Sequence, residues 1–110
     1  MSSKTLVALI LAAGAMLGSA VWAWADGATV FQEGKKFSES EVTIKVGESV
    51  TFTNKDAVTH NVYSQTPGMA FDLRTQKPGE SSTIKFDTVG EADVMCAIHP
   101  QMKMKIKVVQ

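Results

Sequence analysis

Apolar and polar residues alternate with a period of two along several short stretches of the chain. Residues 41–46 alternate, Gly47-Glu48 is a turn signal, and residues 49–53 alternate again, so we predict a β-hairpin here. The same period predicts strands over residues 82–86, 93–96 and 103–108. Two further strands are expected over residues 28–31 and 61–63, where the alternation is weaker. The pattern therefore predicts a chain built from strands.

The segment from Gln65 to Gly79 lacks this regular alternation. It contains two turn signals, Pro67-Gly68 and Pro78-Gly79. We predict a long loop here, with one short helical turn or a short edge strand as the alternatives.

Short strands separated by turn signals at this spacing are typical of a β-sandwich. We predict an all-β fold, an antiparallel Greek-key β-sandwich of about seven to eight strands. Composition supports it, since residues 26–110 are rich in Val, Ile and Thr and contain a single leucine, Leu73. β-branched side chains fit a pleated sheet better than a helix.

Residues 1–25 differ sharply from the rest of the chain. They contain one charged residue, Lys4, and an apolar run that starts near Thr5. Ala23-Trp24-Ala25 matches the small-x-small pattern of a cleavage site, so we predict a secretory signal peptide over residues 1–25. The alternative is an uncleaved membrane anchor, because the apolar stretch has nearly the required length. Cleavage predicts a periplasmic protein formed by residues 26–110.

The length and the net charge of the chain exclude some classes of function. A chain of 110 residues accommodates one small domain, which excludes a large multidomain enzyme. The 11 basic and 11 acidic residues balance, which argues against nucleic acid as a partner, because phosphate binding relies on excess Lys and Arg. We expect a monomer that has no membrane partner once the leader is removed.

The chain has one cysteine, Cys96, which excludes a disulfide framework. A single cysteine in an oxidising compartment has three explanations: it is buried, it pairs with another chain, or it binds a metal.

Metal-binding residue types cluster near the C-terminal end. Cys96, His99 and Met102 follow the pattern C-x-x-H-x-x-M in a short loop between two predicted strands. His60 would join them from the loop after Thr53. One thiolate, two imidazoles and a distant thioether are the ligands of a blue-copper site, which suits the transfer of one electron. Met104 competes with Met102 because both have the same strand parity, so alternation does not separate them.

These residues resemble the motifs of the cupredoxin family. The resemblance runs from about Ala28 to Val109 and is strongest to the amicyanins, then to the pseudoazurins. It rests on three matched segments: His60-Asn61-Val62, Pro78-Gly79-Glu80 and Cys96-x-x-His99-Pro100-x-Met102.

The resemblance implies one type 1 copper per chain, cycling between Cu(I) and Cu(II). His60, Cys96 and His99 would be its equatorial ligands, and the short loop favours Met102 as the axial ligand, with Met104 as the alternative. Asn61 would donate to the cysteine sulfur through its backbone and tie the two ligand loops together through its side chain. His99 would be the port for the electron.

We therefore expect a periplasmic one-electron carrier and no enzyme. By analogy with the amicyanins, its transient partners would be an amine dehydrogenase as donor and a c-type cytochrome as acceptor. The alternatives are a periplasmic copper storage or delivery protein, and a sandwich subunit whose site is vestigial or holds zinc. A nucleophilic pair of Cys96 and His99 is disfavoured because no orienting third group is evident.

Two surface features remain open. Lys103, Lys105 and Lys107 form an outward stripe, which indicates either a solvated strand face or a docking surface for an acidic partner. We also hypothesise an apolar rim around His99 for partner docking, made of Pro67, Met69, Ile98, Pro100 and Gln101.

Overall fold

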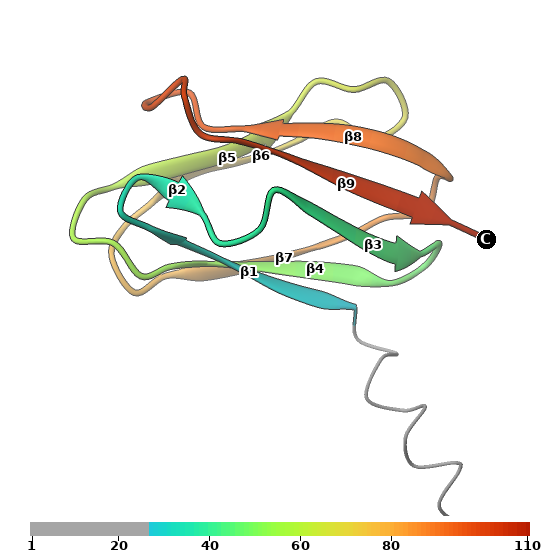
Figure 1. The fold of residues 1–110 in the computed structure, drawn as a ribbon, viewed down its shortest axis with the longest axis horizontal. Coiled ribbons are helices and arrows are strands. Elements are labelled where there is room, and N and C mark those ends of the chain that lie inside the picture. The colour runs from blue at the N-terminus through green and yellow to red at the C-terminus, as the bar shows by residue number, and fades with distance from the viewer. Residues whose placement is uncertain (1–26) are drawn as a thin grey trace, which may run out of the picture.

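The computed structural model describes residues 27–110, which form nine strands (Figure 1). Their bounds are β1 Ala28–Glu33, β2 Lys36–Phe37, β3 Glu41–Lys45, β4 Ser49–Asn54, β5 His60–Ser64, β6 Phe71–Gln76, β7 Ser81–Lys85, β8 Gly90–Met95 and β9 Lys103–Val109. The predicted leader, residues 1–25, lies outside the described residues. Within the described part, no helix has the length and apolar character needed to cross a membrane.

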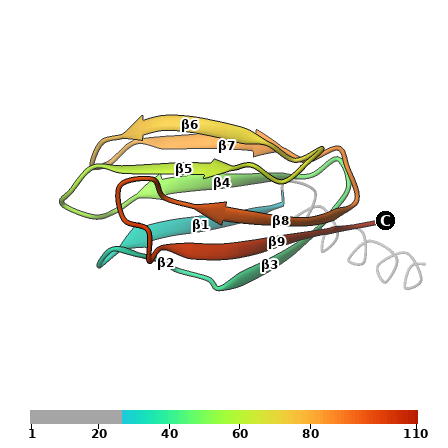
Figure 2. The ribbon, with the colours of Figure 1, turned by 90° about the horizontal axis from the view of Figure 1, so that it is seen from above.

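The strands form two sheets that pack face to face (Figure 1). One sheet has the order β2-β1-β4-β7 and the other β3-β9-β8-β5-β6, as seen from above in Figure 2. The all-β sandwich is confirmed, with nine strands rather than seven to eight. The sheets are mixed, because β1 pairs with β4 and β3 with β9 in parallel. The chain enters the opposite sheet between the two strands of each parallel pair and then returns to run beside the first strand in the same direction.

The predicted hairpin over residues 41–46 and 49–53 is wrong, because β3 and β4 belong to different sheets. The backbone N–H of Val46 still donates to Val109 on β9, whereas the N–H of Gly47 donates to Phe86, which follows β7 in the other sheet. Gly47 has a φ of 94°, which suits glycine at this sharp change of direction. The turn signal was correct, but it marks a crossing between sheets.

The stretch predicted as a long loop contains β6, an edge strand of the five-stranded sheet, which was one of the alternatives. A bulge interrupts its pairing with β5: Asn61 faces Thr75, but Tyr63 faces Asp72, so β6 carries an extra residue. Arg74 within the bulge has a φ of 62°. The bulge breaks the period-two pattern, which explains why alternation did not identify this strand.

The core lies between the sheets and follows the alternation. On β9 the predicted outward residues Lys103, Lys105 and Lys107 are exposed, as is Val109 at its end, and the residues between them are buried. Phe52 is fully buried, packing edge-on against Phe37 and tilted against Phe71. Burying a large apolar side chain of this kind stabilises the fold by about 1.5–3 kcal/mol.

A buried polar layer joins the two sheets near the start of β5. Gln32 on β1 donates to the side chain of Gln76 on β6 at 2.6 Å, and Gln76 donates to the carbonyl of Phe52 at 2.9 Å. Asn54 on β4 donates to the carbonyls of Gln76 and Val58, each at 2.9 Å. These bonds fix the loop between β4 and β5, which leads to His60.

Candidate metal centre

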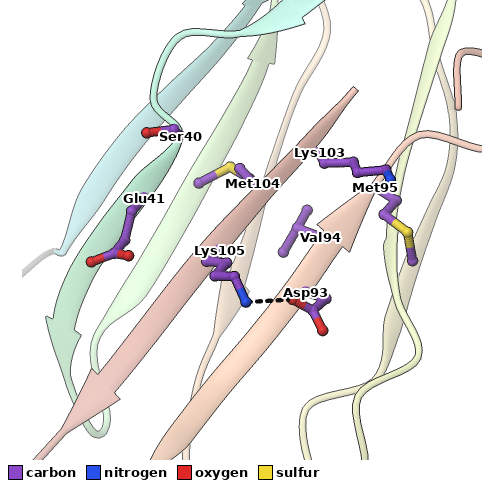
Figure 3. A pocket seen from close by; sticks show the side chains of 8 residues that line it. All are labelled: Ser40, Glu41, Asp93, Val94, Met95, Lys103, Met104 and Lys105. Carbon is purple, nitrogen blue, oxygen red and sulfur yellow. Dashed lines mark ion pairs between the residues drawn. The ribbon is translucent and has the colours of Figure 1, made fainter. Parts of the chain in front are cut away.

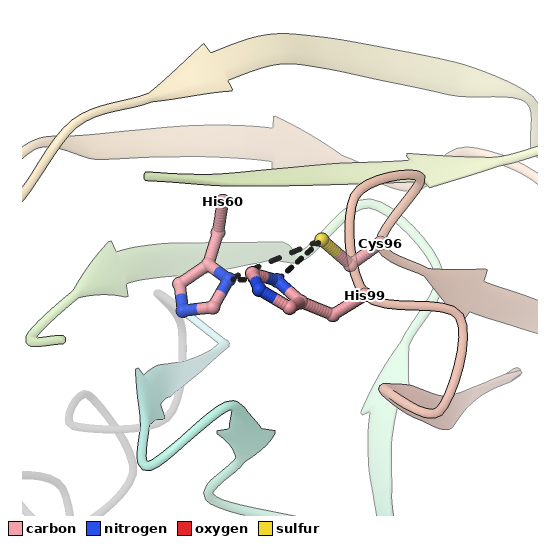
Figure 4. A group of neighbouring side chains, drawn as sticks. All are labelled: His60, Cys96 and His99. Carbon is pink, nitrogen blue, oxygen red and sulfur yellow. Dashed lines mark hydrogen bonds between the residues drawn. The ribbon is translucent and has the colours of Figure 1, made fainter. Parts of the chain in front are cut away.

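Three predicted ligands meet at one end of the sandwich, opposite the C-terminus (Figures 1 and 4). His60 is the first residue of β5, Cys96 follows β8 directly, and His99 lies in the short loop that leads to β9. Antiparallel pairing of β5 with β8 sets the start of β5 beside the end of β8. Sheet pairing therefore joins residues that are more than thirty positions apart in the sequence.

The ligand atoms of the three side chains lie within 4.8 Å of one another. The sulfur of Cys96 is 4.0 Å from Nδ1 of His60 and 3.9 Å from Nδ1 of His99, and the two nitrogens are 3.1 Å apart. Metal bonds of about 2.0–2.3 Å in one plane would place such atoms about 3.5–3.8 Å apart. The three residues are therefore positioned to hold one metal ion.

Asp56 orients the imidazole of His60. Sequence analysis did not identify this role of Asp56. Its Oδ2 lies 2.8 Å from Nε2 of His60 and also accepts the backbone N–H of Lys35. The bond from His60, aided by that of Lys35, lowers the pKa of Asp56 from 3.8 to about 2. The carboxylate is thus ionised at neutral pH and only accepts, so Nε2 of His60 donates to it, and Nδ1 lies on the side of the ring that faces Cys96 and His99. The only sequence signal was an acidic residue four positions before a histidine.

Asn61 makes both contacts expected of it. Its backbone N–H donates to the sulfur of Cys96 at 3.3 Å, and its side-chain oxygen accepts the backbone N–H of Ala97 at 3.1 Å. The strand that carries His60 is therefore tied directly to the loop that carries Cys96 and His99.

A family model described as copper binding proteins, plastocyanin/azurin family, matches residues 26–109. The chain belongs to this family. Among curated relatives, it is 38% identical over 102 residues to amicyanin-alpha of Methylorubrum extorquens, covering 89% of this chain and 84% of the relative. It is also 33% identical to amicyanin of Paracoccus denitrificans, covering 76% of this chain and 67% of that protein.

Solved structures agree with this assignment. A reduced amicyanin variant superimposes with a TM-score of 0.69 at 32% identity, covering 76% of this chain and 84% of that chain. A copper-containing nitrite reductase from Thermus scotoductus gives a TM-score of 0.70 at 30% identity, but the match covers only 22% of that longer chain. The chain thus belongs to a copper-binding family, and His60, Cys96 and His99 are positioned to hold one metal ion.

The two methionines have different surroundings. Met104 is 3% exposed and belongs to the hydrophobic core cluster with Val94 and Ile106. Met102 is 1% exposed, lies outside that cluster, and donates its backbone N–H to the carbonyl of His99 at 2.9 Å. The shared parity of the two residues thus conceals different neighbours.

His99 is half-buried, and the adjacent Ile98 is 47% exposed. Pro100 and Gln101 of the hypothesised rim are also exposed in this loop. Pro67 and Met69 are wrongly placed in that rim, because their loop lies at the other end of the sandwich. Met69 lies beside Gly90, which pairs with Val108 at the far end of β8. Strand β5 runs away from the metal centre and carries this loop with it.

Two surface hollows border the start of β9, and Cys96 lines neither of them. One hollow of about 590 Å³ borders β3, β8 and β9, where Lys105 pairs with Asp93 at 3.3 Å (Figure 3). A second groove of about 540 Å³ borders Met102 and contains Lys35, Lys36 and Lys103 in its lining. The lysines of the predicted stripe therefore have different surroundings. Lys105 is ion-paired, whereas Lys103 lines the groove next to the metal centre.

Proposed function

We propose that this protein is a one-electron carrier with a mononuclear type 1 copper site. His60, Cys96 and His99 would be the equatorial ligands and Met102 the axial ligand. The observation that carries the proposal is the convergence of one cysteine sulfur and two Nδ1 atoms, with neither Nδ1 more than 4.0 Å from the sulfur. When bound, copper would supply a centre that accepts and releases one electron.

Met102 is proposed over Met104 because of their neighbours. The core position of Met104 accounts for its burial without a metal. Met102 is equally buried, but it lies at the end of the ligand loop and is tied to His99. Met104 would then pack beneath the site.

The surrounding residues favour a carrier over a storage or delivery protein. Cys96 and His60 are buried, and hydrogen bonds to Asp56 and from Asn61 hold these two residues in place. A site braced in this way limits rearrangement between oxidation states, which favours electron transfer. A site that hands over its metal would need ligands that are more exposed.

His99 would be the electron port, since it is the most exposed of the three ligands. Ile98 and Val58, 47% and 38% exposed, lie next to ligand-bearing segments and would provide an apolar docking area. Lys35, Lys36 and Lys103 line the adjacent groove together with one acidic residue, Glu39, so the groove is basic on balance and an acidic surface on the redox partner would complement it. The docking would be transient and the carrier monomeric.

Partners and location are proposed from relatives. Besides the amicyanins, the chain is 28% identical to methylamine utilization protein MauL of Methylorubrum extorquens, over 98% of this chain and 96% of that protein. These likenesses support an amine dehydrogenase as donor and a c-type cytochrome as acceptor. We propose cleavage of residues 1–25 and a periplasmic location; the family match begins at residue 26, directly after the predicted cleavage site.

The test is to strip the purified protein of metal, titrate it with Cu(II), and record visible and EPR spectra and a voltammogram. The proposal expects one copper per chain, a strong thiolate-to-copper band and a reversible one-electron wave. Cys96→Ser should abolish the band. A colourless Cu(I) site that exchanges metal readily would instead establish storage or delivery, and a preference for zinc would overturn both.

A further inference from the structure

We propose that Asp72 is a positioning residue for the copper centre, acting through Asn61 on the sulfur of Cys96. Asp72 lies on the edge strand β6, where its carboxylate bonds to Asn61 and Arg74 rather than to any of the proposed ligands. The inference rests on the proposed function, since it assigns a further residue to the same site.

The hydrogen bonds form a continuous path from β6 to the sulfur. Oδ1 of Asp72 accepts from Nδ2 of Asn61 at 2.9 Å, and the same Nδ2 donates to the carbonyl of Arg74 at 2.9 Å. The Asn61 oxygen accepts from Ala97, and its backbone N–H donates to Cys96. Both side-chain ends of Asn61 are thus held, one by β6 and the other by the ligand loop.

The bulge in β6 makes this arrangement possible. It places an extra residue opposite Val62, so that Asp72 and the carbonyl of Arg74 both reach Asn61. Asp72 also accepts the backbone N–H of Arg74 at 2.7 Å, which holds Arg74 at its φ of 62°. A left-handed conformation is unfavourable for arginine, so the bulge depends on such compensating bonds.

The effect on the site follows from the bond to sulfur. An N–H that donates to a thiolate stabilises negative charge on the sulfur, and a partner that fixes the donor keeps this bond short. Loss of the Asp72 carboxylate would remove one of the two bonds that hold Nδ2 of Asn61, and the bond from the Asn61 backbone to the sulfur would lengthen. Since thiolate charge is greatest in the reduced state, a weaker bond should lower the reduction potential.

The first experiment uses the metal-free protein. Hydrogen exchange of the Asn61 side-chain amide and backbone N–H is followed by NMR in wild type, Asp72→Ala, Asp72→Asn and the control Asp87→Ala. Asp87 is a 71% exposed carboxylate that forms an ion pair with Lys85. Asp72→Ala should speed the Asn61 exchange by about fivefold, the factor of one ordinary hydrogen bond, whereas the control should not. Unchanged exchange in Asp72→Ala would overturn the proposal.

The second experiment measures the visible spectrum and potential of the copper-loaded variants. Asp72→Asn keeps an oxygen that accepts from Asn61 and Arg74, so it should restore the wild-type spectrum, whereas Asp72→Ala should change the band and lower the potential. Equal upward shifts in both variants would show an effect of charge alone, and a lowered melting temperature with unchanged spectrum and potential would show a merely structural role. Either result overturns the proposal. Failure of wild type itself to form the band would instead refute the proposed function.

Discussion

Nε2 of His60 lies 2.8 Å from a carboxylate oxygen of Asp56, while Nδ1 of the same ring faces His99 and Cys96. Asp56 thus holds the ring at Nε2, and Nδ1 points toward the other two residues of the metal centre. Because Asp56 is ionised at neutral pH, it accepts a hydrogen bond from Nε2, and this bond keeps Nδ1 turned toward Cys96 and His99. The loop before β5 therefore fixes the orientation of the His60 ring as well as its position.

Asp56→Ala should weaken copper binding by about 10–100-fold, because the His60 ring loses the acceptor that sets its tautomer and orientation. Asp56→Asn retains an accepting oxygen and should fall between this variant and wild type. Competition with a chelator of known affinity measures the change, with Asp87→Ala as the control. An affinity of Asp56→Ala equal to wild type would contradict the orienting role.

Met102→Leu should alter the copper spectrum and raise the reduction potential, because the axial donor that favours Cu(II) is lost. Met104→Leu should leave both nearly unchanged and cost less than about 1.5 kcal/mol of stability, since it exchanges core residues of similar volume. Visible spectroscopy, voltammetry and thermal unfolding of both variants distinguish the two. A larger spectral change in Met104→Leu would reverse the axial assignment.

Asn54→Ala should destabilise the metal-free protein by roughly 2–4 kcal/mol, because it leaves the carbonyls of Val58 and Gln76 and the N–H of Asp56 without their partner. Urea unfolding measures the loss. The matched control is Thr53→Ala on the same strand, which removes an exposed bond to Ser81 and should cost less than about 1 kcal/mol. Equal losses would show that the buried polar layer adds nothing specific.

Stability of the metal-free protein should fall as the solution is acidified, in part through Asp72. Hydrogen bonds from Arg74 and then Asn61 lower the pKa of Asp72 below 3.8 in the folded state. Its contribution is therefore present above pH 3.8 and lost as pH falls through the folded-state value. Urea unfolding at several pH values should show a shallower acid decline in Asp72→Ala. An identical decline would exclude Asp72 from the acid sensitivity.

Replacing Lys35, Lys36 and Lys103 with Gln should slow electron transfer to an anionic reagent such as hexacyanoferrate by several-fold at low salt. The groove beside Met102 then loses its positive charge, and the difference should shrink as salt is added. The control has the same net charge change at the other end of the sandwich, Lys45, Lys85 and Lys107 each to Gln. Equal slowing by both triple variants would refute docking at the groove.

Strands with strict alternation were predictable, and β9 shows why. Met104, Ile106 and Val108 are buried and the lysines between them are exposed, so the alternation in the sequence directly gives the buried face of the strand. The bulged β6 was predicted only as an alternative to a loop, and the two-residue β2 was not predicted, because a period of two needs several uninterrupted residues to be detected.

The metal centre was predictable as a set of residues and only partly as a structure. The short loop already placed Cys96, His99 and Met102 near one another, and the convergence of His60 with Cys96 and His99 is confirmed. The rim was not predictable, since whether Pro67 and Met69 lie near His99 depends on the direction of β5. The sequence likewise held no sign that Asp72 reaches Asn61, because that contact requires the bulge.

By itself, the sequence determined the all-β class, the alternation of the main strands and the residue types that bind copper, because these depend on local periodicity and side-chain chemistry. Only the tertiary structure decided that β3 and β4 lie in opposite sheets, that Met104 belongs to the core, and that Asp56 and Asp72 brace the site from separate loops and strands. These depend on pairing between distant segments, where the competing arrangements differ in hydrogen bonds and burial rather than in local pattern.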